Sequence, residues 1–398
     1  MLLLHNPVKD YAWGPVDGIA DLVGTEPTGG HEAELWVGTH PSAPSVVVGD
    51  PDGRTLADVI AADPMRSLGP ELSGDGHTAL PFLLKVLAIG APLSLQAHPT
   101  RAQAEAGFAK EEAAGLASDA PSRIYRDRSP KPEAMVALTD TWALCGFREP
   151  QRAAELVALL AVPALEPLHA TLAGGGDAAM RTALAWLLGL PGDDRHTIAT
   201  AVGAAARHAD PGDRGDPIGW VRSLTEQHES DPTCLAPLLM ELVHLAPGEA
   251  VHLPAGNLHA YLSGAGVEIM AASDNVLRGG LTPKHVAASE LLAILSFEPG
   301  VPPGPVRTDG GDGITTYDAG EEAFALTLVE PGGGRVDIEP AAPSLLLATG
   351  GAVDVAGAGG DHVLDHGAAL FVAPGSGPLT VAGGGRLWWA TVGNGLPT

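Results

Sequence analysis

The sequence predicts a mainly β protein with one helical insertion, and three observations support this fold class. The chain has 398 residues, of which 52 are glycine and 35 are proline, a composition typical of a globular protein rich in turns. Short apolar runs with strand-like spacing occur in residues 1–148 and return after residue 235. Between these regions Ala and Leu recur at the spacing of amphipathic helices. A chain of this length suits two or three domains.

The first region, residues 1–148, is expected to form strands joined by many turns. Two of its runs are typical of strands, Val46–Val48 and Phe82–Leu87. Ser94, Gln96 and His98 stand at alternate positions of a third run, so a strand would present all three side chains on one face. Thr100 is a suitable N-cap for a helix expected over residues 101–116.

The rest of the chain divides into three segments. Residues 149–235 form the predicted helical insertion, in which Gly- and Pro-rich turns separate the helical runs. Residues 236–305 return to β structure and are expected to complete the first domain, which thus comprises 1–148 and 236–305. Residues 306–398 consist of short apolar runs between glycines, which predicts a small C-terminal β-sandwich.

The charge of the chain limits its partners. The formal net charge is −26, which argues against nucleic acid and against anionic membranes as partners. An anionic ligand would need a locally basic pocket. The chain has only five lysines: Lys9, Lys85, Lys110, Lys131 and Lys284. Lys85 stands inside an apolar, strand-like run, which is an unusual place for a lysine that only contacts solvent.

The cysteines and the N-terminus indicate where the protein works. Two cysteines, Cys145 and Cys234, are too few for a disulfide framework. The first residues lack the basic and apolar regions of a signal peptide, and no apolar run reaches membrane-spanning length. A cytoplasmic location without a membrane partner is therefore expected.

Three short segments far apart in the sequence contain a set of residues that suits a metal ion. They are Leu95–Pro99, Pro130–Glu133 and Pro254–Tyr261. Together they offer two histidines, one glutamate and one glutamine: His98, His259, Glu133 and Gln96. Nitrogen and oxygen ligands of this kind suit a divalent metal such as zinc, although other divalent ions fit the same set.

Two of these segments resemble the paired metal-binding motifs of the cupin (jelly-roll) barrels. The second cupin motif is matched in spacing by Gly248, Pro254, Gly256 and His259, with Ser263 where the motif closes on Asn. The first motif is matched by Gly90, Gln96 and His98, with Gln in place of its first His. The Glu of the first motif is absent at the usual short distance, and Glu133, which follows the expected helix, is the candidate for it.

The wider sequence resembles the type I phosphomannose isomerases. The resemblance covers residues 1–148 and 236–297 well and extends to the remainder only as matching architecture. The matching stretches are Tyr11–Gly14, Ala33–Pro41, Pro81–Leu87, Leu93–Pro99, Lys131–Glu133, Gly256–Tyr261 and Ala272–Lys284. The resemblance implies a metal-binding cupin barrel, an α-helical domain and a second, metal-free cupin-like β-sandwich. It also implies a small sugar phosphate as substrate, one zinc ion per chain and a monomeric protein.

The resemblance also implies roles for individual residues. Gln96, His98, Glu133 and His259 match the zinc ligands, and Arg278 matches an arginine of the active site. Lys131, Lys284 and Ser94 match residues that line the sugar-phosphate pocket. Four further residues fall in pocket-lining motifs: Trp13, Lys85, Tyr261 and Asp274.

The implied reaction interconverts mannose 6-phosphate and fructose 6-phosphate through an enediol. It needs a group that removes the proton at C2 and returns it at C1, positive charge for the developing oxyanion, and an anchor for the phosphate. Candidates for the proton transfer are Lys85, Lys131, Asp274, Glu268 and a water held by the metal. We favour this water, or a lysine in contact with it.

Other functions compete with the isomerase. An iron-dependent cupin dioxygenase usually retains the His-x-His pair, so Gln96 argues against it. A silent sugar-phosphate sensor is disfavoured because every matched motif keeps its reactive residue. A related enzyme or binding protein that acts on another sugar or sugar phosphate is harder to exclude.

Overall fold

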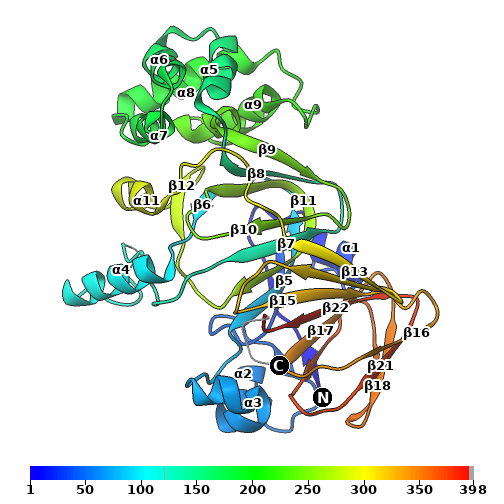
Figure 1. The fold of residues 1–398 in the computed structure, drawn as a ribbon. Coiled ribbons are helices and arrows are strands. Elements are labelled where there is room, and N and C mark those ends of the chain that lie inside the picture. Colours follow the sequence, from blue (N-terminus) through cyan, green and yellow to red (C-terminus); the bar gives the residue numbers. More distant parts are fainter. Residues whose placement is uncertain (121, 394–398) are drawn as a thin grey trace.

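The structure, a computed structural model, describes residues 1–120 and 122–393, so the last five residues of the predicted C-terminal domain lie outside it. The described chain forms three β-sheets and several helices, which confirms the mainly β fold expected from the sequence. Figure 1 shows the helices α5–α9 at one end of the molecule, a large sheet in the middle and the C-terminal strands at the opposite end. Each helix of the described residues is too short or too polar to cross a bilayer.

The largest sheet has ten strands and carries the metal-binding segments. Its longest strand, β11 (His259–Ala271), pairs with four others and is therefore central to the sheet. An irregularity between Tyr261 and Ser263 marks the place where the pairing shifts. The other strands are β2 (Val8–Lys9), β3 (Glu34–Val37), β5 (Phe82–Ile89), β6 (Leu95–Ala97), β7 (Glu133–Ala137), β8 (Thr141–Phe147), β9 (Met240–Leu245), β10 (Ala250–Leu253) and β12 (Leu277–Gly280).

The C-terminal strands form an eight-stranded and a four-stranded sheet. The smaller one contains β16 (Arg335–Ile338), β18 (Val353–Gly357), β19 (Gly360–Leu364) and β21 (Leu379–Gly383). The larger one contains β13 (Val306–Gly311), β14 (Ile314–Asp318), β15 (Ala325–Val329), β17 (Ser344–Thr349), β20 (Ala369–Val372) and β22 (Arg386–Thr391). Two strands from the start of the chain, β1 (Leu2–His5) and β4 (Val46–Val47), complete the larger sheet, because β1 pairs with β20 on one side and β4 on the other.

Most helices gather in one part of the chain, between β8 and β9. They are α5 (Pro150–Leu159), η1 (Pro163–Leu165), α6 (Glu166–Gly174), α7 (Ala179–Leu188), α8 (Gly192–Ala206), α9 (Pro217–Gln227), η2 (Pro232–Leu235) and α10 (Ala236–Leu239). The others are α1 (Gly18–Val23), α2 (Leu56–Ala62), α3 (Pro64–Gly74), α4 (Arg101–Ala113) and α11 (Ala288–Ile294). Thr100 caps α4 through a capping box with Gln103, and the helix ends before Gly115, which has φ 72°.

Apolar side chains join these parts into continuous cores. One core packs the α5–α9 helices onto β6, β8 and β11, with Trp220, Leu184 and Leu262 among its buried members. Another packs β5 against the eight-stranded sheet and buries Leu84 and Trp388 together. The large sheet is thus covered by apolar contacts toward both ends of the molecule, which fixes the strands that carry the polar site.

Candidate metal centre and substrate cavity

Three strands bring the predicted metal ligands together. Gln96 on β6 pairs directly with His259 at the start of β11, and His98 follows β6. Glu133 begins β7, which pairs with β11. His98 Nε2 lies 3.4 Å from Glu133 Oε1, and His259 Nε2 lies 3.5 Å from Glu133 Oε2. Ligand atoms around a tetrahedral zinc with bonds of about 2.1 Å lie about 3.4 Å apart, so these spacings fit such an ion.

Hydrogen bonds fix the form of both histidines. His98 Nδ1 lies 2.7 Å from the carbonyl oxygen of Asn275, and His259 Nδ1 lies 3.2 Å from that of Asn257. Each Nδ1 therefore donates its proton, which leaves the Nε2 lone pair free to bind a metal. The Nε2 atom of His98 is buried and has no hydrogen-bond partner. An orphaned buried nitrogen of this kind is costly unless a ligand satisfies it, so the site fits a divalent cation.

Burial and charge set the protonation of these groups. Burial lowers the pKa of His98, which keeps the imidazole neutral as a metal ligand must be. Burial opposes the ionisation of Glu133, but its interactions with His98, Lys131 and His259 outweigh burial and hold the pKa of Glu133 well below its ordinary value. Lys131 Nζ lies 3.4 Å from Glu133 Oε1, so the lysine contacts the metal centre directly.

A cavity of about 510 Å³ opens beside this centre. His98, Glu133 and His259 are buried beneath the cavity. Gln96, the fourth predicted ligand, and Lys131, which contacts Glu133, both line the cavity and so connect it to the metal ligands. Six further predicted site residues line the cavity: Trp13, Lys85, Ser94, Asp274, Arg278 and Lys284. Tyr261 and Glu268 are not among the residues that line the cavity; both are buried, and the Tyr261 hydroxyl donates to Glu268 Oε1 at 3.0 Å.

Two cations gather on one wall of the cavity. Arg278, on β12, is paired with Gln96 of β6, and Lys284 follows six residues later. The positive charge of Arg278 and, second to it, burial lower the pKa of Lys284. Burial and the charge of Arg126 lower the pKa of Arg278. The two cations therefore lie near enough to repel each other, and an anion between them would relieve that repulsion.

Lys85 also lines the cavity and belongs to a buried ionic cluster. Its Nζ is 3.2 Å from Glu34 Oε2, 3.6 Å from Glu268 Oε2 and 4.9 Å from the centre of the Trp36 ring. Burial opposes its charge, but the two carboxylates outweigh burial and raise the pKa of Lys85, so the ammonium form persists. Burial and the charge of Glu133 raise the pKa of Glu268 to about 7.

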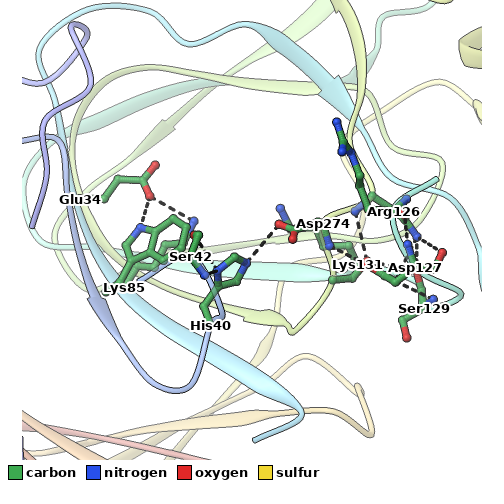
Figure 2. Close-up of polar contacts among 12 residues, drawn as sticks. Glu34, His40, Ser42, Lys85, Arg126, Asp127, Ser129, Lys131 and Asp274 are labelled. Atoms are coloured by element: carbon green, nitrogen blue, oxygen red, sulfur yellow. Dashed lines mark hydrogen bonds and ion pairs between the residues drawn. The ribbon is translucent and has the colours of Figure 1, made fainter. Parts of the chain in front are cut away.

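Asp274 pairs with His40, which lies in the matching stretch Ala33–Pro41. Its Oδ1 lies 3.1 Å from His40 Nε2, and His40 Nδ1 faces the Ser42 hydroxyl at 2.9 Å. Figure 2 shows His40 pointing toward Asp274, with Lys85 and Glu34 on one side of this pair and Lys131 on the other. The hydrogen bond from His40, against the effect of burial, lowers the pKa of Asp274. A carboxylate held in its ionised form this way is a weak base.

Sequence reasoning missed the residues that fix these loops, above all Asn275 and Asp127. Asn275 is fully buried, and its amide nitrogen donates to the carbonyl oxygens of Asp127 and Ser129 at 2.9 Å each. The Asp127 carboxylate accepts from the backbone of Asp274 at 2.8 Å (Figure 2) and from the Ser273 hydroxyl at 2.9 Å. Asn275 lies in the long matching stretch, which was a signal for it, whereas nothing in the sequence pointed to Asp127.

Removing the Asn275 side chain should weaken metal binding. Asn275→Ala is expected to lower zinc affinity by about 10–100-fold, the usual effect of losing a group that orients a metal ligand, because the carbonyl that holds His98 would lose its anchor. Competition with a chelator measures this affinity. Asn6→Ala is the matched control, because Asn6 is also a buried asparagine but its side chain accepts a hydrogen bond from Ser45 and not from a residue of the metal site. Equal affinities in the two variants would contradict the prediction.

Comparisons with known proteins agree with this geometry. Residues 1–150 match the family model described as phosphomannose isomerase type I, catalytic domain. The mannose-6-phosphate isomerase of Escherichia coli K12 is 41% identical over 302 residues, which cover 75% of each chain. A zinc-bound crystal structure of mannose 6-phosphate isomerase superposes with a TM-score of 0.90 at 32% identity and covers 98% of this chain and 99% of its own. A mutant phosphomannose isomerase from Salmonella typhimurium gives the same TM-score and identity and covers 99% of both chains. The chain therefore belongs to the type I phosphomannose isomerase family.

Proposed function

We propose that the protein is a zinc-dependent aldose–ketose isomerase that interconverts mannose 6-phosphate and fructose 6-phosphate through an enediol. The observation that carries the proposal is the convergence of His98, Glu133 and His259 beneath a cavity whose walls hold separate cationic groups. Family membership and the zinc in a solved relative support the same function. The three needs of the reaction, a proton carrier, charge for an oxyanion and a phosphate anchor, each have a candidate group in this cavity.

Gln96, His98, Glu133 and His259 would hold the zinc ion. Because only one of the four ligands is anionic, the set leaves a formal charge of about +1 at the site. Zinc, when bound, supplies Lewis-acid stabilisation of negative charge that develops on the sugar oxygens. The chain contributes the neutral histidines, which their backbone partners hold in the required form.

Arg278 and Lys284 would bind the phosphate, with Ser94 and Trp13 lining the rest of the sugar site. The lowered pKa of Lys284 indicates that the two cations repel one another in the cavity. An anion bound between them would relieve that repulsion. Arginine also offers a planar pair of donors that matches phosphate oxygens. This local basic wall explains how a chain of net charge −26 binds an anionic substrate.

Lys131 is our first candidate for proton transfer between C2 and C1. It lines the cavity and contacts Glu133, so it lies between the substrate space and the metal ligands. Lys85 is less suited to be a base, because its two carboxylate partners keep it protonated. Glu268 has a pKa near the working range of a general base but is not among the residues that line the cavity, and Asp274 is held ionised by His40. We assign Lys85 and Glu268 to the charge balance of the cavity wall.

The finer architecture is also part of the proposal. We infer a cupin barrel from residues 1–148 and 236–305, a helical domain from residues 149–235 and a C-terminal cupin-like sandwich from residue 306 onward, to whose larger sheet β1 and β4 are added from the first segment. That this sandwich binds no metal stays a prediction of the resemblance. A monomeric state and a cytoplasmic location stay predictions. The alternative, action on another sugar or sugar phosphate, keeps the same metal site.

An activity assay tests the proposed function. Purified protein is expected to convert mannose 6-phosphate to fructose 6-phosphate, to lose activity when a chelator removes its metal, and to regain it when zinc is restored. Free mannose and glucose 6-phosphate, assayed in parallel, report specificity. Stoichiometric metal without conversion of mannose 6-phosphate would reject the isomerase and favour the alternative substrates.

A further inference from the structure

The end of the helical insertion contacts residues 280–284, a short segment that begins at the last residue of β12 and lines the cavity, and that we call the cavity turn. We propose that Asp231 and Thr233, at the end of the insertion, are positioning residues that hold the cavity turn and thereby set the affinity for the phosphate group. The structural part of this inference stands alone. Its kinetic readout rests on the proposed function.

The contact is made through one backbone N–H. The amide of Leu281 lies 2.9 Å from Asp231 Oδ2 and 3.1 Å from Thr233 Oγ1, so two acceptors from the insertion share it. Leu281 and Thr233 are both buried, at 3% and 2% exposure, so water does not compete for this donor. These two bonds join parts of the chain that are about fifty residues apart in sequence.

The backbone of the cavity turn is strained at the point of contact. Leu281 has φ 55°, in the left-handed region that residues other than glycine rarely occupy. Gly280 beside it has φ 131°, and a Cβ atom at this position would lie 2.1 Å from Thr233 Oγ1. Thr233 therefore packs against the bare backbone of Gly280. A conformation of this kind persists only where surrounding contacts enforce it, and here Asp231 and Thr233 supply two of them.

The acceptors themselves are anchored within the insertion. Asp231 Oδ1 accepts from the backbone of Thr233 at 3.0 Å and from the guanidinium of Arg195, on α8, at 3.1 Å. Asp231 is the N-cap of η2, and the Leu281 side chain belongs to the apolar core that the insertion shares with β6 and β11. The α5–α9 helices thus provide a rigid base from which Asp231 and Thr233 reach the cavity turn.

The cavity turn lies between the two cations assigned to the phosphate. The pairing of β12 with β6 shifts between Arg278 and Gly280, directly before the turn, and Lys284 closes it. Leu281, Thr282, Pro283 and Lys284 all line the cavity, and the Lys284 amide donates to Thr282 Oγ1 at 3.2 Å. Because Arg278 and Lys284 repel each other, a loosened turn would let them separate and would weaken the anion site.

Thr233→Val tests this role with the least change in shape, because it removes the hydroxyl acceptor and keeps the side-chain volume. Hydrogen exchange of a peptide spanning residues 277–287 is expected to quicken. The dissociation constant for inorganic phosphate, measured by calorimetry on the zinc-loaded protein, is expected to rise about 5-fold, as loss of one buried hydrogen bond predicts. KM for mannose 6-phosphate should rise similarly, while kcat and zinc content stay near wild-type values.

Matched variants separate positioning from general destabilisation. Thr225→Val removes a buried hydroxyl that bonds only within α9, to the Arg222 carbonyl at 2.8 Å, so it should lower stability without changing exchange at 277–287 or phosphate affinity. Thr233→Ser retains the hydroxyl and should show wild-type exchange at 277–287 and wild-type phosphate affinity. Arg195 is partly exposed and bonds to Asp231, so Arg195→Met removes one anchor of Asp231. This variant should quicken exchange and weaken phosphate binding to a smaller extent, and it replaces Thr233→Val if that variant folds poorly.

Equal exchange and equal phosphate affinity in Thr233→Val and Thr225→Val would overturn the inference. Neither measurement requires turnover. A wild-type protein without isomerase activity would therefore reject the proposed function, while exchange and phosphate binding would still decide whether Asp231 and Thr233 hold the cavity turn.

Discussion

Replacing His98 by alanine is expected to lower kcat/KM for mannose 6-phosphate by on the order of 10³-fold and to abolish stoichiometric zinc binding. His98 offers a buried, neutral Nε2 atom without another partner, 3.4 Å from Glu133. Without it the remaining ligands cannot complete a tetrahedral shell. A Lewis acid contributes several kcal/mol to charge stabilisation, and each loss of about 1.36 kcal/mol slows the reaction tenfold.

Metal analysis and steady-state kinetics on the same preparations check this result. His244→Ala is the matched control, because His244 also pairs with a carboxylate, Asp140 at 2.9 Å, but does not line the cavity. That variant should keep its zinc and its activity. A His98→Ala protein with full zinc content and normal turnover would show that the metal centre, if present, lies elsewhere.

The second large effect is expected from Lys131→Met. This change keeps the length and apolar stem of the side chain but removes the group that we assign to proton transfer. Loss of a general acid–base group lowers kcat by about 10²–10⁴-fold, whereas loss of a binding contact mainly raises KM. We therefore expect a fall in kcat with zinc still bound, together with loss of exchange between solvent and the C1 or C2 proton.

Lys110→Met provides the comparison for Lys131→Met. Lys110 is an exposed lysine that also lies near a carboxylate, at 3.6 Å from Glu290, so its loss should leave the kinetics unchanged. Near-normal turnover in Lys131→Met would remove this lysine from the candidates. The same assay on Lys85→Met and Glu268→Gln would then identify which group of the buried cluster carries the proton.

Much of the metal site was predictable because its residues stand in local motifs. The alternate positions of Gln96 and His98 predicted that both side chains lie on one face of a strand, and the turn before His259 has the spacing of a known motif. The structure brings His98, Glu133 and His259 together as expected. Glu133 is far from both segments in sequence, so its place could be inferred only from the resemblance. The roles of these residues, and the domain boundaries, stay predictions until they are tested.

Other features depend on tertiary contacts that no local pattern records. The alternation of apolar residues predicted strands, but it could not predict that Lys85 would contact Glu34 on β3 and Glu268 on β11. His40 stands in a matching stretch, but no local pattern shows that it pairs with Asp274, more than two hundred residues away. Hydrogen bonds of this kind follow from the register between strands and from loop paths, both of which are set by the whole fold.

The position of β1 has a consequence for the order in which the chain folds. Its partners on β20, residues 369–371, are more than 360 positions away in the sequence. The central strands β5, β7 and β11 need no residue beyond 271, so they can pair before the C-terminal strands are in place. Closing a loop as long as the one between β1 and β20 is entropically costly, so we expect the eight-stranded sheet to form after the ten-stranded one. Until β20 is in place, β1 has only β4 beside it, and an apolar strand with a missing partner favours aggregation, so refolding is expected to depend on protein concentration.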